Sequence, residues 1–127
     1  MKCSHLSEEE KMKLMISYID RLKSSTVIVE GKRDRESLLK FGINAITFNN
    51  AVNKPSSIKG NVIILTDLDE DGDRIASFFE SFLSQHDGIN NIDTQFRKKF
   101  LFLFNTRRVE NVFNAYKKEV ELWQKHI

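Results

Sequence analysis

Five carboxylates crowd a short segment that directly follows an apolar run, Val62 to Leu65. They are Asp67, Asp69, Glu70, Asp71 and Asp73. Like charges at this spacing repel one another and oppose folding unless a cation lies among them. Proteins hold Mg²⁺ and Ca²⁺ with carboxylate and carbonyl oxygens. The segment therefore predicts a site for a divalent cation.

Basic residues gather in a second part of the chain. The stretch 97–108 has no acidic residue and contains Arg97, Lys98, Lys99, Arg107 and Arg108. An acidic pocket and a basic stretch on one small chain indicate a metal site beside a polyanion such as nucleic acid. The alternative is that these basic side chains form the solvated faces of two helices.

Apolar periodicity indicates the elements that position these groups. Short apolar or β-branched runs predict strands at 26–30, 44–48, 62–66 and 89–92. Helical spacing predicts helices after the Ser7–Glu10 capping box, at 33–41, at 71–86 and from about Val109 onward. The stretch from Thr94 fits a helix or a strand, and the shared face of its apolar residues favours a helix. Segment 49–59 is expected to be a loop or a short helix. Strands and helices that alternate with short connections predict an α/β fold, with about four mainly parallel strands and helices on both faces.

The same alternation places the candidate residues. Glu30 ends the first predicted strand, in the sequence TVIVEGK, and Asp67 follows the third. Ligands of open α/β sheets bind outside the carboxyl ends of the strands. Glu30 and the acidic segment are therefore expected to meet at that edge.

The length and composition are those of one globular domain of 127 residues, 30% of them charged. We expect an N-terminal helix over 1–24, a core over 25–93 and a helical extension over 94–127 packed on that core. The sequence has no apolar run of membrane-spanning length and no signal peptide, and its single Cys3 suits a reducing compartment. These features predict a cytoplasmic protein without a membrane partner.

Three known motifs share parts of this pattern. An EF-hand loop beginning at Asp67 would need a bidentate Glu where the chain has Phe78. A Walker motif built on EGK would need Gly at position 26 and Ser or Thr at position 33, where the chain has Thr26 and Arg33. Both therefore fail. A phosphohydrolase of the haloacid-dehalogenase type also begins with a strand followed by DxD, but Asp71 stands where that family usually has Thr or Val. It remains an alternative.

Two motifs in order fit another family better. An apolar strand ending in EGK, followed by an apolar strand ending in TDLDEDGDR, resembles the Toprim domain. That domain is shared by topoisomerases, bacterial-type primases, overcoming-lysogeny-defect nucleases, recombination-repair proteins and 5S ribosomal-RNA maturases. The resemblance covers about residues 25–86, and the chain looks like a small stand-alone Toprim protein. It implies a Rossmann-like Toprim fold that binds Mg²⁺, with Mn²⁺ as a substitute.

The resemblance implies a role for each matched residue. Glu30, Asp67 and Asp69 would be catalytic, with Glu30 as general acid or base. The same three residues would hold the metal, with Asp71 as a further ligand, directly or through water. Phosphate contacts are expected from the basic residues, which are Lys32, Arg74, Arg97, Lys98, Arg107 and Arg108.

The Toprim activities differ in what they require. Topoisomerases need a tyrosine nucleophile, and Tyr18 and Tyr116 both fall on apolar helix faces. Primase activity, as the resemblance implies it, needs flanking zinc and helicase-contact domains, which we do not expect in this sequence. We therefore expect Mg²⁺-dependent phosphodiester cleavage, in RNA maturation ahead of DNA repair, with a protein or ribonucleoprotein partner. Phe102 and Phe104 exceed what one helix face buries and are expected to mark a partner interface. The alternative is a non-catalytic Toprim module that binds nucleic acid or protein through its metal site.

Overall fold

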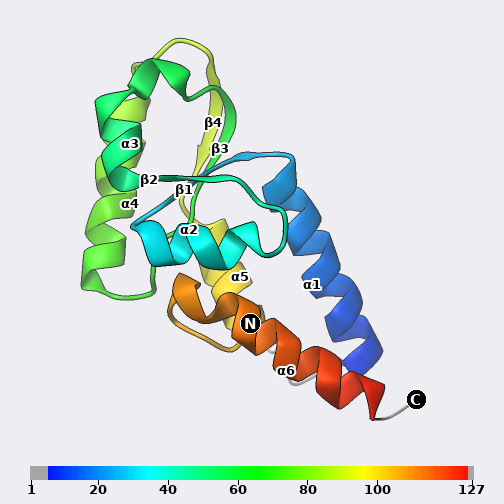
Figure 1. Ribbon diagram of the computed structural model, residues 1–127. Coiled ribbons are helices and arrows are strands. Elements are labelled where there is room, and N and C mark those ends of the chain that lie inside the picture. Colours follow the sequence, from blue (N-terminus) through cyan, green and yellow to red (C-terminus); the bar gives the residue numbers. More distant parts are fainter. Residues whose placement is uncertain (1–5, 126–127) are drawn as a thin grey trace.

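The structure, a computed structural model, describes residues 6–125, in which strands and helices alternate along the chain (Figure 1). The strands are β1 (Thr26–Val29), β2 (Ala45–Thr47), β3 (Gly60–Ile64) and β4 (Ile89–Asp93). The α-helices are α1 (Glu8–Lys23), α2 (Lys32–Leu39), α3 (Phe48–Asn53), α4 (Glu70–Leu83), α5 (Phe96–Leu103) and α6 (Val112–Gln124). Two 3₁₀ turns are η2 (Pro55–Ser57) and η3 (Val109–Asn111). Every predicted strand is present.

The strands form one parallel sheet in the order β2-β1-β3-β4. From β1 the chain crosses to β2 on one side, whereas from β3 it crosses to β4 on the other side. The direction of winding therefore reverses between β1 and β3. Open α/β sheets bind their ligands at the carboxyl ends of the strands at such a switch point. The predicted α/β fold, with a parallel sheet and helices on both faces, is confirmed.

A hydrophobic core lies on each face of the sheet. Helices α1, α2, α5 and α6 contribute to one core, into which Val27 and Val29 of β1 also project. Helices α3 and α4 contribute to the other, together with Ile28 of the same strand. Successive residues of a strand point to opposite faces. Because both faces are covered, β1 reads as an unbroken apolar run.

The segment after β4 is built into the core. The side chains of Phe96, Phe100 and Phe104 are all buried. Lys11 Nζ of α1 lies 2.8 Å from Glu119 Oε1 of α6, and this ion pair joins the two helices. Within residues 6–125, no helix is long and apolar enough to cross a membrane.

Candidate active site

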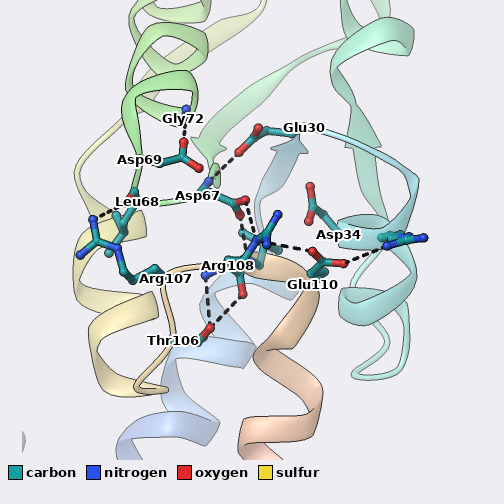
Figure 2. A network of polar contacts seen from close by, with 12 residues as sticks. Glu30, Asp34, Asp67, Leu68, Asp69, Gly72, Thr106, Arg107, Arg108 and Glu110 are labelled. Carbon is teal, nitrogen blue, oxygen red and sulfur yellow. Dashed lines mark hydrogen bonds and ion pairs between the residues drawn. The ribbon is translucent and has the colours of Figure 1, made fainter.

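Glu30 and Asp67 meet where β1 and β3 end (Figure 2). The two strands are neighbours in the sheet, so the residues that follow them leave the same edge side by side. The backbone N–H of Asp67 donates to Glu30 Oε2 at 2.7 Å. The expected meeting of Glu30 with the acidic segment is therefore present in the structure.

The C-terminal segment holds the Asp67 side chain in place. Asp67 is only 8% exposed, and its Oδ1 accepts a hydrogen bond from the Val109 N–H at 2.8 Å. Arg108 Nε lies 3.9 Å from Asp67 Oδ2 and 3.5 Å from Glu110 Oε1. A short stretch of chain, far from Asp67 in sequence, thus supplies both a donor and a cation to this carboxylate.

Asp69 is the N-cap residue of helix α4. Its Oδ1 accepts from the Gly72 N–H at 2.7 Å, so the helix starts at Glu70, one residue earlier than predicted. The Thr66 hydroxyl donates to the Gly72 carbonyl at 2.8 Å. A side chain on Gly72 would have no room, since its β-carbon would lie 1.8 Å from the Asp67 carbonyl oxygen. The loop that carries Asp67 and Asp69 is therefore folded tightly against the first turn of α4.

Asp71 takes a different position from the one expected. It lies on the exposed side of α4, where it forms an ion pair with Arg74. The structure does not bring it together with Glu30 and Asp67. The geometry gives no support to Asp71 as a direct metal ligand.

Two further carboxylates, Asp34 and Glu110, line the same edge and were missed by sequence reasoning (Figure 2). Asp34 is buried in the first turn of α2, and its Oδ2 accepts from the Gly31 N–H at 3.1 Å. A sequence signal for it exists, because an acidic residue in the first helical turn is typical of N-terminal capping. Glu110 lies 3.9 Å from Arg33 Nη1. Its position has no local signal, since it depends on how the C-terminal segment folds back.

Burial and mutual repulsion raise the pKa values of three carboxyl groups at this edge, those of Glu30, Asp34 and Asp67. Burial is the main cause of the raised pKa of Glu30, against the hydrogen bond that it accepts from the Asp67 N–H. The negative charges of Asp67, Asp34 and Asp69 add to the rise. Burial also raises the pKa of Asp67, and the charge of Asp69 adds to it. Carboxylates held together against their own repulsion are typical of functional sites.

Replacing Asp34 with Asn is expected to stabilise the protein at neutral pH. Burial raises the pKa of Asp34 from 3.8 to about 6, so the folded state holds a proton that the unfolded state has lost between these values. Stability from this group is therefore full below about pH 3.8 and is lost as the pH rises through about 6. Asn keeps an oxygen for the Gly31 N–H and has no charge to bury. Urea unfolding should show a gain of about 1–2 kcal/mol at pH 7 that disappears near pH 4.

Asp87→Asn, at an exposed position, is the control and should show no such pH-dependent gain. A lower stability of Asp34→Asn at every pH would mean that the carboxylate is needed for structure.

The donor set suits a hard divalent cation. Within residues 6–125, no three His, Cys, Asp or Glu side chains are arranged to hold an ion by themselves. Mg²⁺ does not need such a cage, because it keeps several waters and usually takes one or two carboxylates together with substrate phosphate. Glu30, Asp67 and Asp69 fit that pattern. Burial and repulsion disfavour the charged forms of Glu30 and Asp67, and a cation would relieve both effects.

Most of the predicted phosphate-binding residues lie on the surface. They are Lys32, Arg74, Lys98, Arg107 and Arg108, all of which are exposed. Arg107 Nη2 donates to the Leu68 carbonyl at 2.6 Å, and the Leu68 N–H donates back to the Arg107 carbonyl at 2.9 Å (Figure 2). Arg107 and Arg108 thus lie beside the acidic loop.

The position of Arg97 contradicts its predicted role in phosphate binding. It is only 3% exposed, so its guanidinium does not reach a phosphate backbone at the surface. Its Nη1 donates to the Asp67 carbonyl at 2.8 Å and to the Thr66 carbonyl at 3.4 Å, and its Nη2 pairs with Asp73. That pairing lowers the pKa of Asp73. Arg97 therefore holds the loop at Thr66 and Asp67 from the buried side.

Replacing Arg97 with Met should destabilise the protein by about 1–3 kcal/mol, because two backbone carbonyls of the loop lose their charged donor. Lys98→Met, at the exposed neighbouring position, is the control and should change the free energy of unfolding much less. Urea unfolding measures both. Equal effects of the two substitutions would show that Arg97 does not hold the loop.

Comparison with known proteins finds relatives whose names state no activity. No protein-family model matches the chain. It is 29% identical over 115 residues to a UPF0292 protein of Pyrococcus abyssi, covering 84% of this chain and 87% of that one. It is 26% identical over 115 residues to a UPF0292 protein of Pyrococcus furiosus, covering 84% and 85%. These similarities extend over most of each chain, so they include the sheet.

A solved structure of a protein from Aquifex aeolicus has the same fold. It superposes with a TM-score of 0.60 at 29% sequence identity, covering 76% of this chain and 95% of that protein. Its name likewise states no activity.

Proposed function

We propose that this protein is a Toprim-type, Mg²⁺-dependent protein that cleaves phosphodiester bonds in nucleic acid, with RNA ahead of DNA as substrate. The hydrogen bond from the Asp67 N–H to Glu30 Oε2 carries the proposal. It joins the EGK and TDLDEDGDR segments, on which the Toprim resemblance depends. It does so at the switch point of a parallel sheet, where such folds bind ligands.

Each side chain has a distinct part in this proposal. Glu30, Asp67 and Asp69 would hold Mg²⁺, which when bound polarises a phosphoryl oxygen and neutralises negative charge that develops during displacement. Glu30 is suited to move a proton, because its raised pKa brings it closer to neutral pH. Arg107 and Arg108 bind and orient the flanking phosphates. The Val109 N–H keeps Asp67 in one position.

The direct test is cleavage of end-labelled structured RNA and of DNA by the purified protein. Products should appear with Mg²⁺ or Mn²⁺ and be absent with EDTA. Two results would contradict the proposal. One is cleavage that continues in EDTA, and the other is cleavage activity that elutes apart from the protein in chromatography. Nucleic acid that is bound but never cut would favour the second function below.

The position of Arg108 favours a second function, that of a non-catalytic binding module. Its guanidinium lies beside both Asp67 and Glu110, and so it neutralises part of the acidic edge without a metal. A site balanced in this way suits metal-dependent docking of nucleic acid or protein without turnover. Such a module would bind labelled RNA more tightly in Mg²⁺ and release it intact.

Basic residues that contact phosphate should make binding sensitive to salt. Lys98→Ala and Arg108→Ala are each expected to weaken RNA binding for all sequences alike and to flatten the slope of log K against log salt by about one unit. Lys54→Ala, at an exposed position after α3, is the control and should leave the slope unchanged. Fluorescence anisotropy over a range of KCl concentrations measures the slope. If all three variants keep the wild-type slope, Lys98 and Arg108 do not contact phosphate and belong to an ordinary solvated surface.

A further inference from the structure

A small apolar hollow lies beside the acidic loop and takes no part in the chemistry above. Its walls come from Leu68, Leu101 and Phe102, and its rim from Asn105, Thr106 and Arg107. Leu68 stands between the two candidate ligands Asp67 and Asp69. The hollow therefore borders the loop that carries these ligands. Arg107, which lines the hollow, donates to the Leu68 carbonyl of that loop (Figure 2).

Phe102 is the aromatic wall of this hollow. Its side chain is 49% exposed, whereas Phe104, the other phenylalanine expected at an interface, is 2% exposed and belongs to the core. Of the two expected interface residues, only Phe102 is thus at the surface. An aromatic ring that is half open to solvent beside a cationic rim offers a stacking surface for a flat, electron-rich ring.

The dimensions of the hollow limit what can enter. It encloses about 210 Å³, whereas sites for whole drug-sized ligands enclose about 300–1,000 Å³. It therefore suits one ring system of a larger ligand. The rim offers a side-chain amide on Asn105 and a hydroxyl on Thr106, which are groups that hydrogen-bond to the edges of nucleobases.

We propose that this hollow holds one unstacked base of a single-stranded nucleic acid, whose backbone passes Arg107 and the Asp67–Asp69 loop. The inference rests on the proposed function. The base stacks on Phe102, and Arg107, already bonded to the Leu68 carbonyl, faces the adjoining phosphate with its remaining N–H groups. A base within a duplex is stacked and paired and cannot enter without being extruded. The hollow therefore selects single-stranded segments, such as loops and ends, over uninterrupted duplex.

The test compares Phe102→Ala with Phe78→Ala by fluorescence anisotropy in EDTA and in Mg²⁺. Phe78 is a matched control because it is 43% exposed but lies on α4, against the other face of the sheet. The probes are short uridine and thymidine strands, the same strands with abasic positions, and a blunt duplex. Phe102→Ala should weaken binding of the intact single strands by about 5- to 150-fold, the worth of one stacked base. Phe102→Trp should bind as wild type does.

The outcomes separate this inference from the function on which it rests. The inference is supported if Phe78→Ala binds every probe with the affinity of wild type. It also requires that Phe102→Ala and wild type have equal affinities for the abasic strands, and equal affinities for the duplex. If Phe102→Ala weakens binding of both the uridine and the thymidine strands, the hollow recognises the base alone. If it weakens binding of only one of them, the hollow recognises the sugar as well as the base. Equal losses in Phe102→Ala and Phe78→Ala overturn the base pocket while binding of nucleic acid stands. No binding by wild type to any probe overturns both. Thermal melting of Phe102→Ala and Phe102→Leu checks that the losses do not come from unfolding.

Discussion

Glu30→Gln is expected to lower the rate of metal-dependent cleavage by about 10²–10⁴-fold, the usual contribution of a general acid or base. Gln keeps an oxygen that can accept the Asp67 N–H, so the joint between β1 and β3 should survive. The substitution also removes a charge that Asp67, Asp34 and Asp69 repel. The variant should therefore be at least as stable as wild type while it is nearly inactive. Initial rates and urea unfolding, measured on one preparation, test both statements.

Glu70→Gln is the matched control for Glu30→Gln. Glu70 belongs to the same acidic run but is exposed in the first turn of α4. Its replacement should leave the cleavage rate close to that of wild type. If the two variants lose activity equally, the net charge of the edge matters and the proton-transfer role of Glu30 is wrong. If Glu30→Gln unfolds the protein, Glu30 is chiefly structural.

Gly72→Ala should destabilise the protein by at least about 3 kcal/mol, the upper end of the cost of overpacking. Helix propensity alone predicts the opposite sign, because Ala is favoured over Gly inside a helix by about 1 kcal/mol. The added β-carbon would lie 1.8 Å from the Asp67 carbonyl oxygen and 2.8 Å from its carbonyl carbon. Both are backbone atoms and cannot rotate away. The first turn of α4 and the loop at Asp67 must therefore separate, and activity should fall along with stability.

Gly31→Ala is the control for Gly72→Ala. A β-carbon at Gly31 meets nothing within 4 Å, and the residue has ordinary extended dihedral angles. Its replacement should cost less than about 1 kcal/mol, the usual scale of a change at a helix N-cap. Urea unfolding of the two variants gives the comparison. Similar values for both would mean that the loop can move away from α4 at little cost.

The sequence predicts the sheet well because its signals are local. Thr26 to Val29 is an unbroken apolar strand with a turn directly after it, and the structure has a strand covered on both faces there. Boundaries are less certain, because strand ends depend on pairing. β3 ends at Ile64, yet the Leu65 N–H still donates to the Ile28 carbonyl at 2.8 Å. The meeting of Glu30 with Asp67 could also be predicted, since parallel neighbours end at one edge.

The groups that hold the acidic loop could not be predicted, because each depends on contacts between distant segments. Arg97 lies in a run of basic residues that is typical of a surface, but the Asp67 carbonyl, 30 residues away, draws it into the core. The Val109 N–H reaches Asp67 across 42 residues. A backbone donor carries no sequence signature at all. The meeting of Glu30 with Asp67 was thus predictable, whereas the way in which these two carboxylates are held was not.

The bond from the Val109 N–H to Asp67 also bears on the order in which the molecule is made. Synthesis proceeds from the N-terminus, and early segments begin to fold before later ones emerge. All the strands therefore leave the ribosome before Arg107, Arg108 and Val109 do, and so do Glu30, Asp34, Asp67 and Asp69. Until then Asp67 lacks its donor and its neighbouring cation. Under the proposed function, the nascent chain therefore has no finished cutting edge until the segment that carries Arg107, Arg108 and Val109 has folded back onto the sheet.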